Sequence, residues 1–121
     1  MGLDMYARKL RKVPDSDVDF KEDGEEFYYW RKHPNLHVWL ANLYHQKNGS
    51  DEVHEFIGPV RLTLDDLKVL EMAVMSNTLP KTSGFFFGRS DGSEVKGDLE
   101  FIRKARLEID EGWTVYYTSS W

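Results

Sequence analysis

Apolar and polar residues alternate near both ends of the chain, which is the pattern of strands that bury one face. Residues 3–8 place Leu3, Met5 and Ala7 on one side, with polar or aromatic residues between them. Residues 113–118 alternate in the same way and give the clearest strand signal in the sequence. A period of two residues predicts a half-buried β-strand at each place.

A helical repeat replaces this alternation from Pro34 onward. Proline is favoured at the first helical position, because its missing N–H has no intrahelical partner there in any case. The turn-forming residues 48–51 end this helix. Its apolar face is formed by residues three and four positions apart, namely Leu36, Trp39, Leu40 and Leu43.

Two further helices are indicated downstream. Thr63 can cap the first of them, and Asp65 and Asp66 suit the positive end of its dipole. Its expected buried stripe is Leu64, Leu67, Leu70 and Val74, with Met72 and Met75 as filler beside it. The second helix runs over about 94–109 with Val95, Leu99, Ile102, Ala105 and Ile109 on one face. Asp98 and Glu100 are assigned to its solvated side.

Short apolar runs predict further strands. Residues 27–30 suit a strand or a lead into the first helix, residues 55–62 a short strand, and the three phenylalanines 85–87 a short buried strand. Strands and helices mixed in a chain of 121 residues favour the α+β class. We therefore expect a single small domain, residues 1–121, with about three helices packed against a short mixed or antiparallel sheet.

Residues 9–26 differ in composition from their surroundings. A basic cluster at residues 9–12 is followed by an acidic stretch from Asp15 to Glu26, and the segment contains Pro14 and Gly24. This composition predicts a mobile, charged surface loop.

Composition excludes several classes of function. The net charge of −5 is unfavourable for general nucleic-acid binding, which needs excess positive charge. The absence of cysteine excludes disulfides, thiolate metal sites and cysteine nucleophiles. No apolar run is long enough to span a bilayer, and the N-terminus lacks the layout of a signal peptide, so a cytoplasmic location without membrane binding is expected. The aromatic content, 14%, is high for a core of this size.

The densest polar and aromatic segment precedes and opens the first helix. Two cations stand before a helix N-terminus, which itself favours an anion, and an aromatic ring there could stack on a planar ligand. The segment therefore forms a candidate site for a nucleotide-like ligand. Alternatively, the cations are simply exposed or pair with the acidic stretch, since short strings of this kind are common. The candidate residues are Trp30, Arg31, Lys32, His33, Asn35 and His37.

Two residues elsewhere complete the set of candidate ligand-binding residues. Arg89 lies in a Gly/Ser-rich stretch whose spacing matches neither phosphate-binding glycine motif, and could contact an anion. Tyr116 belongs to an aromatic cluster that exceeds the needs of a small core, and tyrosine is enriched at binding surfaces.

The sequence predicts no catalytic residue, metal site or cofactor. His33 and His37 have the four-residue spacing of a helical metal pair, but no glutamate lies between them in the zinc-protease pattern and no third ligand is identifiable. Asp4 could act as a general base, although a strand aspartate more often faces solvent or bonds a loop.

Several strings together resemble a known family. They are Met1-Gly2-Leu3-Asp4-Met5-Tyr6, the segment Tyr29 to His37 with Trp39, Leu79-Pro80, Ser83-Gly84-Phe85-Phe86-Phe87-Gly88, and Tyr116-Tyr117 with Ser119-Ser120-Trp121. This combination resembles a family of small uncharacterised proteins of bacteriophages and bacterial prophages. Thr118 replaces the glutamine of the family ending, and residues 89–97 replace a tyrosine-rich stretch. The resemblance implies a phage or mobile-element origin and no particular chemistry.

These observations favour a small, acidic, non-enzymatic binding protein of phage type. It would inhibit a host factor or counter a host defence by binding a host protein or by sequestering a nucleotide-like ligand. The alternative is a small enzyme acting on a phosphorylated or nucleotide substrate, with His33 or His37 as acid/base and Arg31 holding the phosphate. That alternative requires Arg31, a histidine and Asp4 to converge on one pocket. The oligomeric state is left open.

Overall fold

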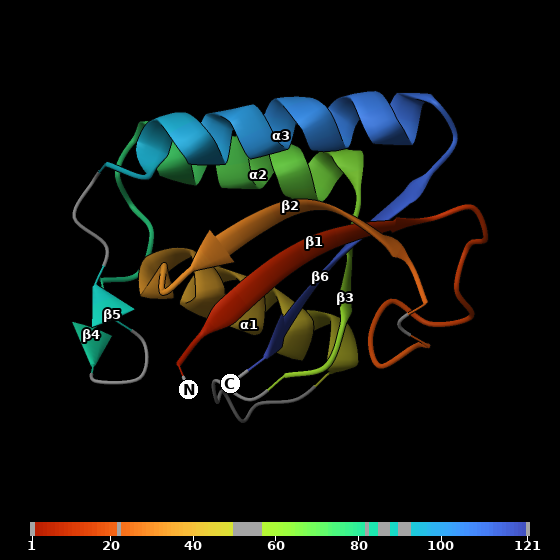
Figure 1. The fold of residues 1–121 in the computed structure, drawn as a ribbon, viewed down its shortest axis with the longest axis horizontal. Coiled ribbons are helices and arrows are strands. Elements are labelled where there is room, and N and C mark those ends of the chain that lie inside the picture. The colour runs from red at the N-terminus through yellow and green to blue at the C-terminus, as the bar shows by residue number, and fades with distance from the viewer. Residues whose placement is uncertain are drawn as a thin grey trace.

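Four antiparallel strands, in the order β2-β1-β6-β3, form the main sheet (Figure 1). The computed structural model describes residues 2–21, 23–49, 57–81, 83–84, 88–89 and 93–120. The strands are β1 (Asp4–Leu10), β2 (Glu25–Arg31), β3 (Val60–Leu62) and β6 (Thr114–Ser120). Asp4 pairs with Arg31 on one side and with Ser120 on the other, so three distant parts of the sequence meet at one end of the sheet.

The three helices begin and end where the local sequence directs. They are α1 (Pro34–Asn48), α2 (Leu64–Met75) and α3 (Val95–Asp110). Pro34 stands at the first turn of α1, and Gly49 ends that helix with a left-handed φ of 70°. Thr63 and Asp66 bond each other's backbone N–H groups in a reciprocal cap at the start of α2. None of these helices combines the length and the apolar character needed to cross a membrane.

The helices pack against the sheet around one hydrophobic core. In Figure 1, α2 and α3 lie side by side along one border of the sheet, and α1 lies behind the strands. The rings of Trp30 and Phe101 join β2 to α3, and those of His37 and Tyr117 join α1 to β6. The expected α+β fold, a small single domain of three helices and an antiparallel sheet, is confirmed.

A second, two-stranded sheet lies outside this core. It pairs β4 (Ser83–Gly84) with β5 (Gly88–Arg89), and β5 lies against α1. The strand predicted over residues 85–87 lies outside the described residues, as do residues 55 and 56 of the strand predicted over 55–62. The described part of the latter strand begins at Val60.

The two faces of the main sheet differ in what covers them. Alternation along β1 directs Leu3, Met5 and Ala7 into the core, where all three are fully buried. The opposite face, called here the outer face, carries Asp4 and Tyr6 of the same strand. The helix contacts described above are all made on the core side.

Residues 11–21 and 23–24, called here the connecting segment, cover only part of the outer face. The backbone N–H of Arg61 donates to the Asp17 carbonyl, and Val18 forms an isolated bridge with Val60, so the segment lines the free edge of β3. Farther on, Phe20 packs edge-on against Tyr116, with ring centroids 5.1 Å apart. The β6 and β3 half of the outer face is thereby covered.

A tyrosine of α1 fixes the middle of the connecting segment. The Tyr44 hydroxyl donates to the Asp19 carboxylate, with oxygen–oxygen distances of 2.7 and 2.6 Å. Burial, and then the hydrogen bond and charge of Asp19, raise the pKa of Tyr44 to about 12. A Cβ atom on Gly58 would overlap the Asp19 carboxylate, so a larger residue there would displace this carboxylate from its contact with Tyr44.

Several sequence expectations need correction. The loop predicted over 9–26 is shorter, since residues 9–10 belong to β1 and residues 25–26 to β2; its mobility stays a prediction. Met72 and Met75 do not fill the core but are 64% and 70% exposed, and Leu64 is also exposed. Asp98, assigned to the solvated side of α3, is only 1% exposed.

Replacing Tyr44 by phenylalanine should loosen the connecting segment without disturbing the core. The lost hydrogen bonds to Asp19 should lower the free energy of unfolding by about 0.5–1.5 kcal/mol. Hydrogen–deuterium exchange should accelerate in residues 11–21, while amides of β1 and β6 keep their protection. Tyr29→Phe is the matched control, since it also removes a tyrosine–aspartate bond, but one outside the segment. Equal acceleration in both variants would contradict this role of Tyr44.

Candidate functional site

The predicted ligand segment is divided between the two faces of the sheet. Because successive strand residues point to opposite sides, Trp30 is buried in the core while Tyr29 and Arg31 are exposed on the outer face. The segment then turns into α1, and His33 and His37 are buried on the helix side. The candidate residues therefore form two separate groups.

The buried group centres on the carboxylate of Asp98. Trp30 Nε1 donates to Asp98 Oδ1 at 3.1 Å, and His33 Nε2 lies 2.8 Å from Asp98 Oδ2. Both oxygens of this buried carboxylate thus face ring nitrogens of residues far away in the sequence. His33 also occupies the N-cap position of α1, where its side chain makes no capping bond. The network ties β2, α1 and α3 together.

A second buried contact joins α1 to the sheet. His37 Nδ1 lies 2.6 Å from the hydroxyl of Tyr117, and both side chains are fully buried. Burial raises the pKa of Tyr117 well above 10.0, so the phenol keeps its proton. The direction of this hydrogen bond follows the tautomer of the His37 imidazole, since a protonated phenol can both donate and accept.

The two histidines do not form a metal pair. Their rings bond different partners, Asp98 for His33 and Tyr117 for His37. Among the described residues, no three His, Asp or Glu side chains gather closely enough to hold a metal ion. The four-residue spacing of His33 and His37 places both side chains in the core, where they contribute to packing.

The exposed group forms a compact polar and aromatic surface, called here the tyrosine–arginine patch. The Tyr29 hydroxyl donates to Asp4 Oδ1 at 2.6 Å, and Arg31 Nη1 donates to the same oxygen at 2.9 Å. The rings of Tyr6 and Tyr29 lie 5.4 Å apart, and the Arg8 guanidinium lies 5.1 Å from the centroid of the Tyr6 ring. Five residues of β1 and β2 thus hold one another in place: Asp4, Tyr6, Arg8, Tyr29 and Arg31.

The environment of Asp4 makes this carboxylate a poor general base. The hydrogen bond from Tyr29, helped by the charge and hydrogen bond of Arg31, holds the pKa of Asp4 below its usual 3.8. An effective base needs a pKa close to the working pH. Asp4 instead orders the side chains of Tyr29 and Arg31.

Of the remaining candidate residues, Lys32 borders the patch, since its side chain and that of Arg31 both lie beside Gly2. Asn35, Tyr116 and Arg89 belong to α1, β6 and β5. Lys32, with φ of 51°, donates its backbone N–H to the Leu3 carbonyl at 2.9 Å, and Asn35 is partly buried in the first turn of α1. Tyr116 is fully buried beneath the connecting segment, where its hydroxyl accepts from the Gly24 N–H at 3.0 Å. Arg89 belongs to β5 of the small sheet.

The convergence required by the enzyme alternative is not found among the described residues. Arg31 and Asp4 do meet, but on the outer face. His33 and His37 are buried on the core side, with Asp98 and Tyr117 as their partners. The sheet therefore separates the proposed acid/base from the proposed phosphate-binding group.

Sequence reasoning missed Asp98, although a signal was present. Asp98 precedes Ile102 by four residues and Ala105 by seven, so it lies on the stripe of α3 that faces the core. A carboxylate on an apolar stripe predicts buried partners, since an unpaired buried charge is very unfavourable. An aromatic cluster joins β2 to α3 through Phe27, Tyr28, Trp30 and Phe101.

Replacing Asp98 by alanine should strongly destabilise the fold. The change leaves the Trp30 indole N–H and the His33 ring without their buried acceptor, at a cost of about 2–4 kcal/mol. Urea denaturation followed by Trp fluorescence measures this loss. Glu100→Ala is the control on the exposed side of α3, where the carboxylate bonds Arg103, and it should leave the midpoint nearly unchanged. Similar midpoints for the two variants would refute the bridging role of Asp98.

The titration of Asp4 should report the integrity of the patch. Its depressed pKa stabilises the folded state above the unfolded carboxyl value near 3.8, and this contribution is lost as the pH falls through the lower folded value. Tyr29→Phe should raise the pKa of Asp4 toward 3.8, because it removes the strongest cause of the shift. Carbon-detected NMR titration of the carboxyl checks this, and an unchanged pKa would contradict the assigned role of Tyr29.

Comparison with protein-family models, curated proteins and solved structures finds no match for this chain.

Proposed function

We propose that this chain is a non-enzymatic binding protein of phage type that engages a host protein through the tyrosine–arginine patch. The observation that carries the proposal is the uncovered half of the outer face, where Asp4 orders Tyr29 and Arg31 in one exposed surface. Tyrosine and arginine are the residues most often found, with tryptophan, at the energetic centres of protein interfaces.

Preorganisation supports recognition at this surface. Tyr29 is 45% exposed, yet its hydroxyl and ring are both held, by Asp4 and by Tyr6. Side chains that are already ordered lose less conformational freedom on binding, so more of the contact energy remains as affinity. The patch thus combines exposure with order, which isolated exposed aromatics lack.

The position of β2 adds a second feature. Within the described part of the chain, β2 pairs only with β1, whereas the free edge of β3 is lined by the connecting segment. An extended segment of a partner protein can pair with such an edge through main-chain hydrogen bonds. Its side chains would then lie beside Tyr29 and Arg31. We propose this mode of docking for the host protein.

The protein-binding alternative is favoured over a nucleotide site in residues 29–37. A nucleotide site there would need Trp30 and the histidines beside Arg31, but the sheet separates them and their polar atoms bond within the core. The same separation weighs against the enzyme alternative.

The strings that carry the family resemblance also bear on the proposal. Three of them lie far apart in sequence, at residues 2–6, 29–37 and 116–120, and adjoin at one end of the sheet through the pairing of Asp4 with Arg31 and Ser120. We propose accordingly that the protein acts in the cytoplasm of a bacterial host as a host-factor inhibitor or a counter-defence protein.

Charge reversal and truncation in the patch should abolish capture of the partner. Immobilised wild-type protein, Tyr29→Ala, Arg31→Glu and the control Lys68→Glu on α2 are exposed to one bacterial lysate, and bound proteins are quantified by mass spectrometry. A partner should be retained by wild type and by Lys68→Glu but reduced at least about tenfold by either patch variant, a change of 1.4 kcal/mol. Melting curves confirm that all four proteins fold.

Two outcomes would refute the proposal. One is a set of captured proteins that is identical for the patch variants and the control. The other is a partner that protects α2, rather than β1 and β2, from hydrogen–deuterium exchange in the reconstituted complex.

A further inference from the structure

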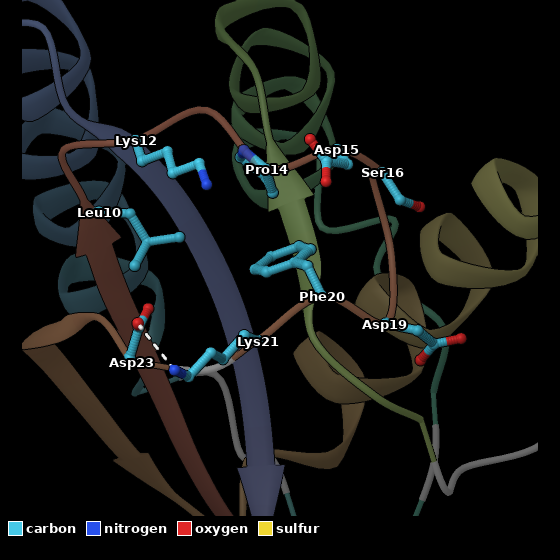
Figure 2. Close-up of a pocket in the computed structure, with 9 residues that line it drawn as sticks. All are labelled: Leu10, Lys12, Pro14, Asp15, Ser16, Asp19, Phe20, Lys21 and Asp23. Atoms are coloured by element: carbon cyan, nitrogen blue, oxygen red, sulfur yellow. Dashed lines mark ion pairs between the residues drawn. The ribbon is translucent and has the colours of Figure 1, made fainter.

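A pocket of about 390 Å³ opens between the end of β1 and the connecting segment. Figure 2 shows this segment arching over the hollow, with β1 and β6 behind it. The volume is at the lower end of the range typical of small-molecule sites. The lining residues are Leu10, Lys12, Pro14, Asp15, Ser16, Asp19, Phe20, Lys21 and Asp23.

The lining of the pocket combines one aromatic ring with two lysines and three aspartates. In Figure 2, Leu10, Lys12 and Phe20 surround the hollow, whereas Ser16 and Asp19 point away from it. The Asp19 carboxylate is directed outward because it accepts the hydrogen bonds of Tyr44. The lining is thus less acidic at its centre than its three aspartates suggest.

The two lysines of the pocket differ in their pairing. Lys21 Nζ lies 3.9 Å from Asp23, an ion pair at the limit of contact and largely exposed. Lys12 forms no ion pair within the described part of the chain. An ammonium group beside an aromatic and aliphatic wall favours a ligand that carries a negative charge on an apolar body.

Contacts within the chain hold the walls of the pocket. Phe20 packs edge-on against Tyr116, the Gly24 N–H bonds the Tyr116 hydroxyl, and the Asp19 N–H bonds the Pro59 carbonyl at 3.0 Å. These contacts hold the connecting segment at both sides of the hollow. A preformed cavity binds with little loss of loop entropy.

We propose that this pocket binds a small planar organic anion, with the ring lying against Phe20 and the acidic group bonded to Lys12. The volume admits one ring system with a short substituent. A nucleoside monophosphate and an aromatic carboxylate share this chemistry. The site is distinct from the tyrosine–arginine patch and does not depend on the proposed function.

Isothermal titration calorimetry with matched probes tests the proposal. Adenosine 5′-monophosphate and 4-hydroxybenzoate represent the two sources, while adenosine and inorganic phosphate supply the ring or the charge alone. We expect one of the two aromatic anions to saturate the protein with a dissociation constant below about 1 mM, and both half-molecules to bind at least about tenfold more weakly. Which anion binds identifies the source.

Point substitutions test whether the anion binds in this pocket. Lys12→Met should weaken the bound anion about tenfold, since it removes a charge-assisted hydrogen bond, while Lys68→Met on α2 leaves the affinity unchanged. Amide NMR shifts on titration should concentrate in residues 10–21. Tyr29→Ala should bind the anion as wild type does, which separates this site from the patch.

Three results would overturn the proposal. Neither aromatic anion saturates the protein, or phosphate alone binds as tightly as the monophosphate, or Lys12→Met and Lys68→Met bind the anion with equal affinity.

Discussion

The buried carboxylate of Asp98 is the polar contact on which the packing of this protein depends. Its two oxygens bond Trp30 of β2 and His33 at the start of α1, so one side chain of α3 joins three elements. A charge in a core is tolerated only when it is fully bonded, and these partners meet that condition. These bonds hold the side chains of Trp30 and His33 in the core, whereas Arg31, which stands between them in the sequence, lies on the outer face.

The sheet consequently separates two kinds of chemistry. On the helix side, Trp30 and His33 bond Asp98, and His37 bonds Tyr117. These contacts stabilise the core. On the outer face, Asp4 orders the exposed side chains of Tyr29 and Arg31, while the connecting segment occupies the other half. Residues adjacent in the sequence therefore have unrelated roles, because strand alternation assigns neighbours to opposite faces.

Local patterns predicted the elements, and long-range contacts decided the site. Pro34, Gly49 and the Thr63 cap act within a few residues, so the helices were predictable from sequence. The burial of Asp98 depends on partners more than 60 positions away. Tyr116, which is predicted to belong to a binding surface, is covered by the connecting segment, which is remote from it in the sequence. Composition predicts that segment only as a mobile, charged loop. The aromatic content is likewise higher than a core of this size needs, but it does not show which rings are exposed in the fold.

The connecting segment gives the outer face its two distinct regions. Its contacts with β3 and Tyr116 cover half of the outer face and enclose the pocket. The segment ends where β2 begins at residue 25, so it does not extend over the strands of the patch. Since β1 carries Arg8 of the patch and Leu10 of the pocket, only one residue separates them along the strand. A partner seated on the patch would therefore lie close to the mouth of the pocket.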